Sequence, residues 1–241
     1  MKNLLGLAAV AAGVGCAGLD TGNAEVTTIK VALSAGPGQP VDANGTAFAV
    51  TKADATVERV DLYLPAGVSC AEVPGLGAAG SLDRFTCEVD KIRANGPWRV
   101  NLLTGVAVPA FPKVPVVAGT YRRIDVRFED NDTDLVLEGT VPLNNQSVPF
   151  RFRGELDEEV RFEGADVVAI ENELSEAILK LDPTAWFAGV PIAQCVADGD
   201  LEIVGGVLEL ANGDGACDDI EDLIEEALSG SGEIDDDIFD D

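Results

Sequence analysis

The chain has 241 residues, 46% of them apolar, and a formal net charge of −27 at pH 7. The apolar share is sufficient for a folded core, so the composition excludes a chain that is disordered throughout. The charge repels phosphate and argues against nucleic acid as a partner. The absence of histidine excludes every Ser-His, Cys-His or His-metal mechanism.

Residues 1–16 are typical of a secretory signal. Lys2 gives the positive start, and the apolar run from Leu4 to Val14 follows it. This run is shorter than the ~20 residues of a membrane-spanning helix. We therefore expect an exported protein whose first segment is removed.

Two cleavage sites compete at the end of this segment. In one interpretation, residues 13–16 form a lipobox and Cys16 becomes the lipidated first residue, although Gly13 stands where a branched apolar residue is usual. In the other, an ordinary small-x-small cut at Gly15-x-Ala17 removes Cys16. Lipidation is the favoured interpretation, and it predicts a membrane partner through the lipid anchor.

The residues after Cys16 bear on localisation. Ala17, where an Asp would favour retention in the inner membrane, predicts the outer membrane or the cell surface; a periplasmic or secreted protein is the alternative. Residues 17–25 are predicted to be a flexible tether. Bacterial lipidation supplies the several acyl chains that stable anchoring requires.

Four cysteines remain when Cys16 is set aside, and outside the cytoplasm they predict two disulfides. Three pairings are open, and the sequence gaps favour Cys70–Cys87 and Cys195–Cys217. Each would stabilise the fold by ~3 kcal/mol in the chain-entropy model. Without a C-x-x-C pair or a histidine, zinc is not expected.

Residues 26–189 show mostly the two-residue alternation of half-buried strands, with polar or Gly/Pro-rich turns between them. The turns include Asn95-Gly96-Pro97. We expect an antiparallel β-sandwich of about seven to nine strands. The segments that carry the pattern are Ile29–Leu33, Phe48–Val50, Val60–Leu64, Phe85–Val89, Trp98–Leu102, Tyr121–Phe128, Leu135–Leu137, Val148–Phe152, Val160–Phe162 and Ile178–Leu181.

The C-terminal quarter differs in charge from the rest. No Lys or Arg follows Lys180, whereas eighteen Asp and Glu residues lie between Leu181 and Asp241. The spacing of Ile220, Ile224 and Leu228 predicts an amphipathic helix. We therefore expect residues 190–229 to form a small acidic helical appendage, tied by a disulfide, and residues 230–241 to be a disordered acidic tail.

Two short motifs resemble a known class of domain. Ala118-Gly119-Thr120-Tyr121 leads into Ile124-x-Val126-x-Phe128, and Ile178-x-x-Leu181-Asp182-Pro183-x-x-Trp186-Phe187 closes the domain. The region from about residue 25 to 190 is similar to the β-sandwich domains of unknown function in bacterial surface lipoproteins. The resemblance implies export and a sandwich fold, and it implies no catalytic residues.

The search for chemistry gives one metal hypothesis. Calcium needs several oxygen ligands on a bent backbone, and three acidic segments could supply them: Asp130-x-Asp132-x-Asp134, Asp198-x-Asp200-x-Glu202 and Asn212-x-Asp214. The second fails as an EF-hand, because Ile203 occupies the position of the required glycine.

Two classes of function remain open. The first is a non-catalytic structural or interaction module at the cell surface, with a protein or glycan partner. The second is a protein that binds calcium or a small ligand through its acidic loops. An enzyme is not expected, because only unspecific carboxylate pairs are available for catalysis.

Overall fold

The computed structural model describes residues 28–73, 76, 81–82, 84–117, 119–129, 135–154, 159–170 and 175–235. Within these ranges the chain forms two sheets and two α-helices, which confirms the expectation of a mainly β fold. No helix of this part is long and apolar enough to cross a membrane. The predicted signal 1–16, the tether 17–25 and residues 236–241 lie outside the described residues.

The smaller sheet joins the two ends of the described chain. Its order is β15 (Gly232–Asp235), β12 (Ser175–Leu181), β1 (Thr28–Ala35) and β7 (Lys113–Pro115). β1 and β12 run parallel, with Ile29 opposite Ser175 and Ala35 opposite Leu181. The expectation of a purely antiparallel fold is therefore wrong. Parallel strands need a long connection, and nearly the whole domain lies between these two.

The larger sheet is organised around one long strand, β2 (Ala49–Tyr63). One edge of β2 pairs first with β9 (Leu135–Leu143) and then with β8 (Gly119–Phe128), while the other edge pairs with β5 (Lys91–Asn101). The two strands expected at Phe48–Val50 and Val60–Leu64 are thus one. The alternation continues between them through buried Ala53, Ala55 and Val57.

The remaining strands extend this sheet on both sides. β10 (Gln146–Gly154) pairs with β9 and, in parallel, with β14 (Val207–Leu210), and β11 (Glu159–Ile170) pairs with β8. The short strands are β3 (Ser81–Leu82), β4 (Phe85–Glu88), β6 (Val106–Val108) and β13 (Ile203–Val204).

The predicted turn at Asn95-Gly96-Pro97 is wrong, because β5 continues through it. The register with β2 shifts here, so that Val57 lies opposite Trp98 while Arg59 lies opposite Asn95. The extra residues form a β-bulge, which bends a strand without ending it. Gly96 allows the close approach, since a Cβ there would lie 2.5 Å from the Val57 carbonyl oxygen.

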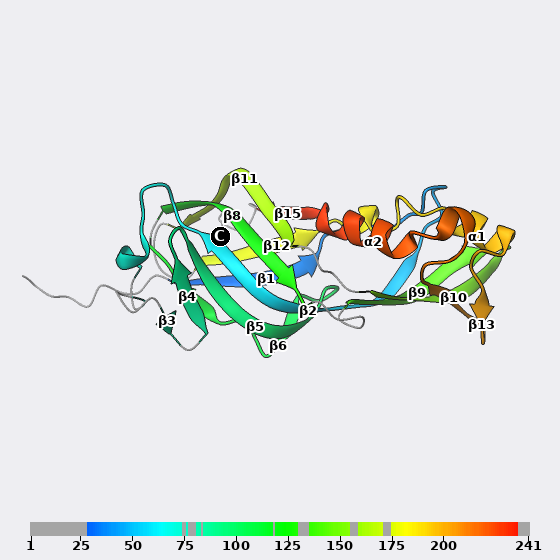
Figure 1. Cartoon of the computed structure of the whole chain (residues 1–241), viewed down its shortest axis with the longest axis horizontal. Coiled ribbons are helices and arrows are strands. Elements are labelled where there is room, and N and C mark those ends of the chain that lie inside the picture. The colour runs from blue at the N-terminus through cyan, green and yellow to red at the C-terminus, as the bar shows by residue number, and fades with distance from the viewer. Residues whose placement is uncertain are drawn as a thin grey trace, which may run out of the picture.

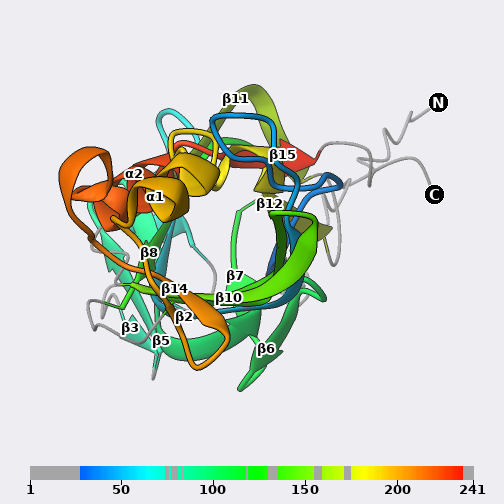
Figure 2. The same ribbon diagram turned by 90° about the vertical axis from the view of Figure 1, so that its right-hand side faces the viewer.

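Figure 1 shows β2 running along the long axis of the molecule, between an end that carries the helices and an end made of strands. Buried side chains from both sheets and both helices form one continuous core. Viewed end-on, the strands surround this core, and α1 and α2 lie together on one side (Figure 2). At the helical end Phe48, Phe150 and Phe187 pack together, with ring centroids 4.5–5.7 Å apart.

The C-terminal part contains the helical turn η3 (Pro183–Ala185), α1 (Ile192–Asp198), η4 (Gly215–Cys217) and α2 (Ile220–Ser229). The expected amphipathic helix is confirmed, since Ile220, Ile224 and Leu228 are buried on one face of α2. The tail expected to be disordered from residue 230 begins instead with β15, which pairs with β12.

Candidate functional site

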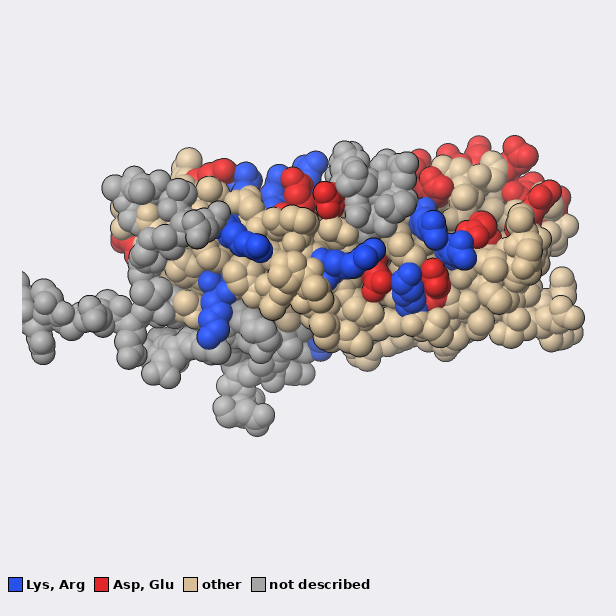
Figure 3. Space-filling model, turned by 90° about the horizontal axis from the view of Figure 1, so that it is seen from below, with Lys and Arg blue, Asp and Glu red and all other residues tan. Residues whose placement is uncertain are grey.

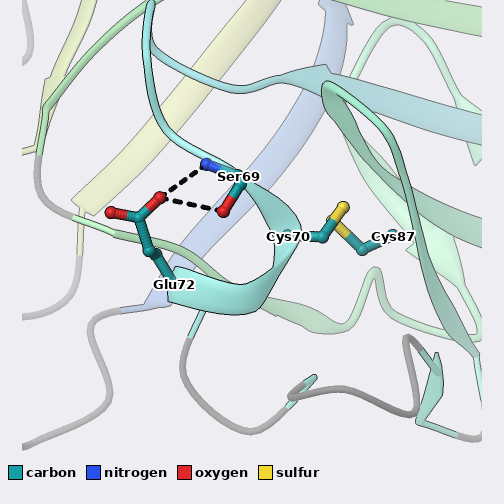
Figure 4. The surroundings of a disulfide bond; sticks show 4 residues. All are labelled: Ser69, Cys70, Glu72 and Cys87. Carbon is teal, nitrogen blue, oxygen red and sulfur yellow. Dashed lines mark hydrogen bonds between the residues drawn. A yellow bond between two sulfur atoms is a disulfide. The ribbon is translucent and has the colours of Figure 1, made fainter.

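The first disulfide joins a helical turn to a strand. Cys70 opens η1 (Cys70–Glu72) and is bonded to Cys87 of β4, as the sequence gaps predicted. Figure 4 shows Glu72 turned back to Ser69, whose backbone N–H and hydroxyl both donate to its carboxylate, at 2.8 and 3.0 Å. These two bonds lower the pKa of Glu72. The Cys70–Cys87 disulfide fixes the long loop after β2 to β4, near the edge of the large sheet.

The second predicted disulfide, Cys195–Cys217, is confirmed and joins α1 to η4. Both cysteines are fully buried. The segment that the bond closes contains β13 and β14, and β14 adds to the large sheet beside β10. The predicted appendage is therefore part of the main sheet as well as a helical cover. The four residues of β14 are too short a run for the alternation pattern to predict a strand.

The acidic residues proposed as calcium ligands have separate surroundings. The Asp198 carboxylate accepts a hydrogen bond from the Gln194 amide at 2.6 Å, whereas the Asp200 carboxylate faces the backbone of Gly215. Asp214 precedes η4, and its carbonyl accepts from the Cys217 N–H. Among the described residues, no three Asp, Glu, Cys or His side chains group closely enough to hold a metal ion.

Several predicted site residues cannot be placed. Cys16, the proposed lipidation site, and the proposed calcium ligands Asp130, Asp132 and Asp134 lie outside the described residues. The lipid anchor and a calcium site at 130–134 therefore stay predictions.

A row of four charged residues crosses the outer face of the large sheet. Arg93 of β5 lies opposite Asp61 of β2, Asp61 lies opposite Asp125 of β8, and Asp125 lies opposite Arg161 of β11. Both aspartate side chains are only 1% exposed. Two buried carboxylates on adjacent strands repel each other, so the arrangement requires cations around them.

The cations come from the neighbouring positions of the same strands. Asp61 accepts hydrogen bonds from Lys91 at 2.6 Å and from Arg93 at 2.8 Å. Asp125 accepts from the Arg123 Nε atom at 2.8 Å, and the Arg161 Nε atom lies 3.8 Å away. Asp61 is thus neutralised by basic side chains of the adjacent strand β5, and Asp125 is neutralised mainly by Arg123 of its own strand.

The pKa of Asp61 shows that the neighbouring cations outweigh the cost of burying its charge. Burial would raise the pKa of Asp61, but hydrogen bonds from Arg93 and Lys91 outweigh it and hold the pKa below its usual range. The hydrogen bond to Asp125 raises the pKa of Arg123 in turn. Because each carboxylate pairs with an arginine side chain, the row has the geometry of a structural ion-pair network.

Tyr63 lies on β2 two residues after Asp61, beside the middle of the row. The Arg123 guanidinium lies over its ring, 4.2 Å from the centroid, and the Lys91 ammonium lies 5.4 Å away. Burial, and then the neighbouring Asp125 charge, raise the pKa of the Tyr63 hydroxyl. Sequence reasoning missed this network. Its signal was the alternation of charged with apolar residues in three separate strands, but the pairing of those strands is long-range.

An exposed apolar edge lies on the same sheet. β6 pairs with β5 and forms an outer strand, on which Val106 and Val108 are 59% and 67% exposed. Leu103, in the turn before β6, is 41% exposed. The whole stretch from residue 102 to 112 contains no charged residue. Uncharged outer strands with exposed apolar side chains are typical of surfaces to which another chain adds.

Charge is distributed unevenly over the surface. In the view from below, basic side chains lie along the middle of the molecule, and acidic side chains gather at the end that carries the helices (Figure 3). This matches the absence of basic residues after Lys180.

No family model matches the chain, and neither does any curated protein or solved structure. The resemblance to the sandwich domains of surface lipoproteins therefore stays a prediction from the two short motifs.

Proposed function

We propose that the chain is an exported, membrane-anchored, non-catalytic interaction module that acts at the cell surface. One observation carries the proposal. The two disulfides account for four of the five cysteines, and the fifth is Cys16, which follows the apolar N-terminal run. Disulfides are typical of proteins outside the cytoplasm, and a cysteine in this position is the attachment point that bacterial lipidation uses.

The interaction part of the proposal is supported by the edge strand β6. Its exposed valines lie in an uncharged stretch of a strongly acidic chain, so a partner can approach there with the least repulsion. The partner that fits an open strand edge is an extended segment of another protein, which adds backbone hydrogen bonds and packs against alternate side chains.

We also infer a sandwich-like arrangement of the two sheets, facing each other across the core. The support is that Leu33 and Leu179 of the smaller sheet belong to the same buried cluster as Ile124 and Val126 of the larger one. An experimental structure would test it by the packing of these four side chains.

Anchoring is tested with the Cys16→Ser variant in the bacterial host. We expect the wild-type chain in the membrane fraction, labelled by radioactive palmitate, and the variant unlabelled and soluble in the periplasm or medium. The proposal requires that palmitate labelling and membrane association are lost together. A variant that stays in the membrane fraction would show that Cys16 is not the anchor.

Partner contact is tested by placing a photo-crosslinking amino acid at position 106 in intact cells. We expect a discrete crosslinked product with another protein. The matched control places the same group at Val89, which is 90% exposed but lies in the turn after β4, away from β6. Equal products from both positions, or none from position 106, would contradict an interaction surface at β6.

A further inference from the structure

A hollow of about 330 Å³ lies where the two sheets meet at one edge of the helical end. Its wall is made by the loop after β1, the start of β2, the turn between β5 and β6, and the segment after β12. This volume is within the range of ~300–1,000 Å³ of small-molecule sites in proteins.

The parallel pair β1 and β12 explains why the hollow forms here. Because the strands run in the same direction, the chain leaves both at the same edge of the sheet. The Gly36 N–H donates to the Leu181 carbonyl at 2.8 Å, and this bond holds the carboxyl ends of β1 and β12 together. Crevices beyond the carboxyl ends of parallel strands are common binding sites in α/β proteins, and residues at and just after the ends of β1 and β12 line this hollow.

The base of the hollow is fixed before anything binds. Phe48 and Trp186 are fully buried, and the ring of Phe48 packs 4.5 Å from that of Phe187. The backbone bond from the Phe48 N–H to the Pro40 carbonyl, at 2.8 Å, holds the loop after β1 against β2. A preformed wall of this kind lowers the ordering cost of binding.

The chemistry of the wall selects an uncharged ligand. Among the described residues, no Asp, Glu, Lys or Arg lines the hollow, although the chain carries 43 acidic and 16 basic residues. Two of the lining side chains can form hydrogen bonds, the amide of Gln39 and the indole N–H of Trp186. Within the described part of the chain, the Trp186 N–H is buried without a partner and Gln39 makes no side-chain hydrogen bond. A buried donor such as the Trp186 N–H normally has a partner, whereas the Gln39 amide is exposed and can bond to water.

We propose that this hollow is a binding site for an uncharged, mainly apolar small molecule that carries at least one hydrogen-bond-accepting or -donating group. The hollow shares Leu103 with the apolar edge but is lined by no residue of β6 and by none of the proposed calcium ligands, and the proposal does not depend on the lipid anchor. Binding buries apolar ligand surface against the aromatic base, while Gln39 supplies a donor and an acceptor at the rim.

The experiment uses two fluorescent probes that differ mainly in charge. N-phenyl-1-naphthylamine is neutral and carries one N–H group, whereas 8-anilinonaphthalene-1-sulfonate adds a negative charge to a similar ring system. We expect the neutral probe to bind the folded full-length chain saturably, and the anionic probe to bind roughly tenfold more weakly or worse. Equal or tighter binding of the anionic probe would overturn the proposal.

A substitution locates the site. Ala49 lines the hollow from an exposed position on β2, so Ala49→Phe fills the space without removing a core side chain. We expect it to weaken the neutral probe by at least about tenfold. Ser147→Phe is the matched control, because it places the same ring at an exposed position of β10 away from the hollow. Melting curves confirm that both variants fold. Unchanged affinity in a folded Ala49→Phe variant would show that the probe binds elsewhere, and would contradict the proposal.

Discussion

At the strand end of the molecule, Asp61 and Asp125 lie side by side beneath a layer of arginine and lysine side chains. At the helical end, α1, α2 and the segments around them carry acidic residues and no basic ones. Both ends share β2, and each has its own disulfide. The strand end thus neutralises a buried charged row, whereas the acidic side chains of the helical end lie nearer the surface, where Glu209 pairs with Arg151 at 3.3 Å.

Asp61 and Asp125 are buried where cations and carboxylates lie close together. The carboxylates of the strand end are removed from water and therefore need partners in fixed positions. The acidic groups of the helical end keep their hydration, because the burial there is achieved by Ile220, Ile224 and Leu228 on the opposite face of α2. We expect the strand end to depend on individual ion pairs and the helical end to depend on apolar packing.

The largest effect is expected from breaking the apolar packing of the helical end. Phe187→Ala removes a fully buried ring that contacts Phe48 and Phe150, and it should cost ~3–5 kcal/mol of unfolding free energy. Because β2 belongs to both ends, we expect a single transition. Far-UV circular dichroism and tryptophan fluorescence should melt together, since Trp186 and Trp98 report on the two ends. Separate transitions would show that the ends unfold independently.

The two disulfides are expected to differ in their contributions to stability. They span 17 and 22 residues, so loop closure alone should contribute ~3 kcal/mol from each. Cys195 and Cys217 are fully buried, however, whereas Cys70 and Cys87 are half-buried. The double Ala variant of the Cys195–Cys217 pair should therefore lose more stability than that of Cys70–Cys87. Urea unfolding of the two double variants measures this order, and a reversed order would show that the buried pair is strained.

The ion-pair row gives the next effect. Asp61→Asn leaves Lys91 and Arg93 without their buried partner and should cost ~2 kcal/mol at pH 7. The pKa of Asp61 is lower in the folded chain than in the unfolded one. Its contribution is therefore present above about pH 4 and is lost as the pH falls through the folded pKa. The free energies of unfolding of the wild-type chain and of Asp61→Asn, measured by urea titration, should converge at low pH.

A control separates burial from mere pairing. Glu88 also pairs with Arg93, at 3.1 Å, but its side chain is 47% exposed. Glu88→Gln should cost less than ~1 kcal/mol. An equal loss from Glu88→Gln and Asp61→Asn would contradict the idea that burial makes the row important.

The smallest effect concerns the acidic residues of the helical end. Sodium chloride should raise the melting temperature slightly, because it screens repulsion among carboxylates. A calcium site filled at ~100 times its dissociation constant would instead add ~2.7 kcal/mol. At matched ionic strength, we expect Asp198→Asn with Asp200→Asn to leave any calcium-specific rise unchanged. Loss of that rise would restore the Asp198–Asp214 region as the calcium site.

Local patterns predicted most strands but not how they assemble. Alternating apolar residues located Tyr121–Phe128 and Val148–Phe152, because one face of each is buried. The length of β2 was missed because Ala53 and Ala55 are weak signals of burial. The parallel pairing of β1 with β12 and the contact of Asp61 with Asp125 join distant segments, and such contacts depend on packing that a local pattern does not contain.

The direction of β1 has a mechanical consequence. A force applied through the N-terminal segment pulls Thr28 along the axis of β1, past β12, whose seven paired residues run in the same direction. Such a load acts in shear, so the hydrogen bonds along this ladder must break together instead of opening one after another. We expect single-molecule pulling from the N-terminus to meet higher resistance than pulling that peels β15 from β12. A domain tethered through β1, as we propose, would thereby withstand drag while β6 engages a partner.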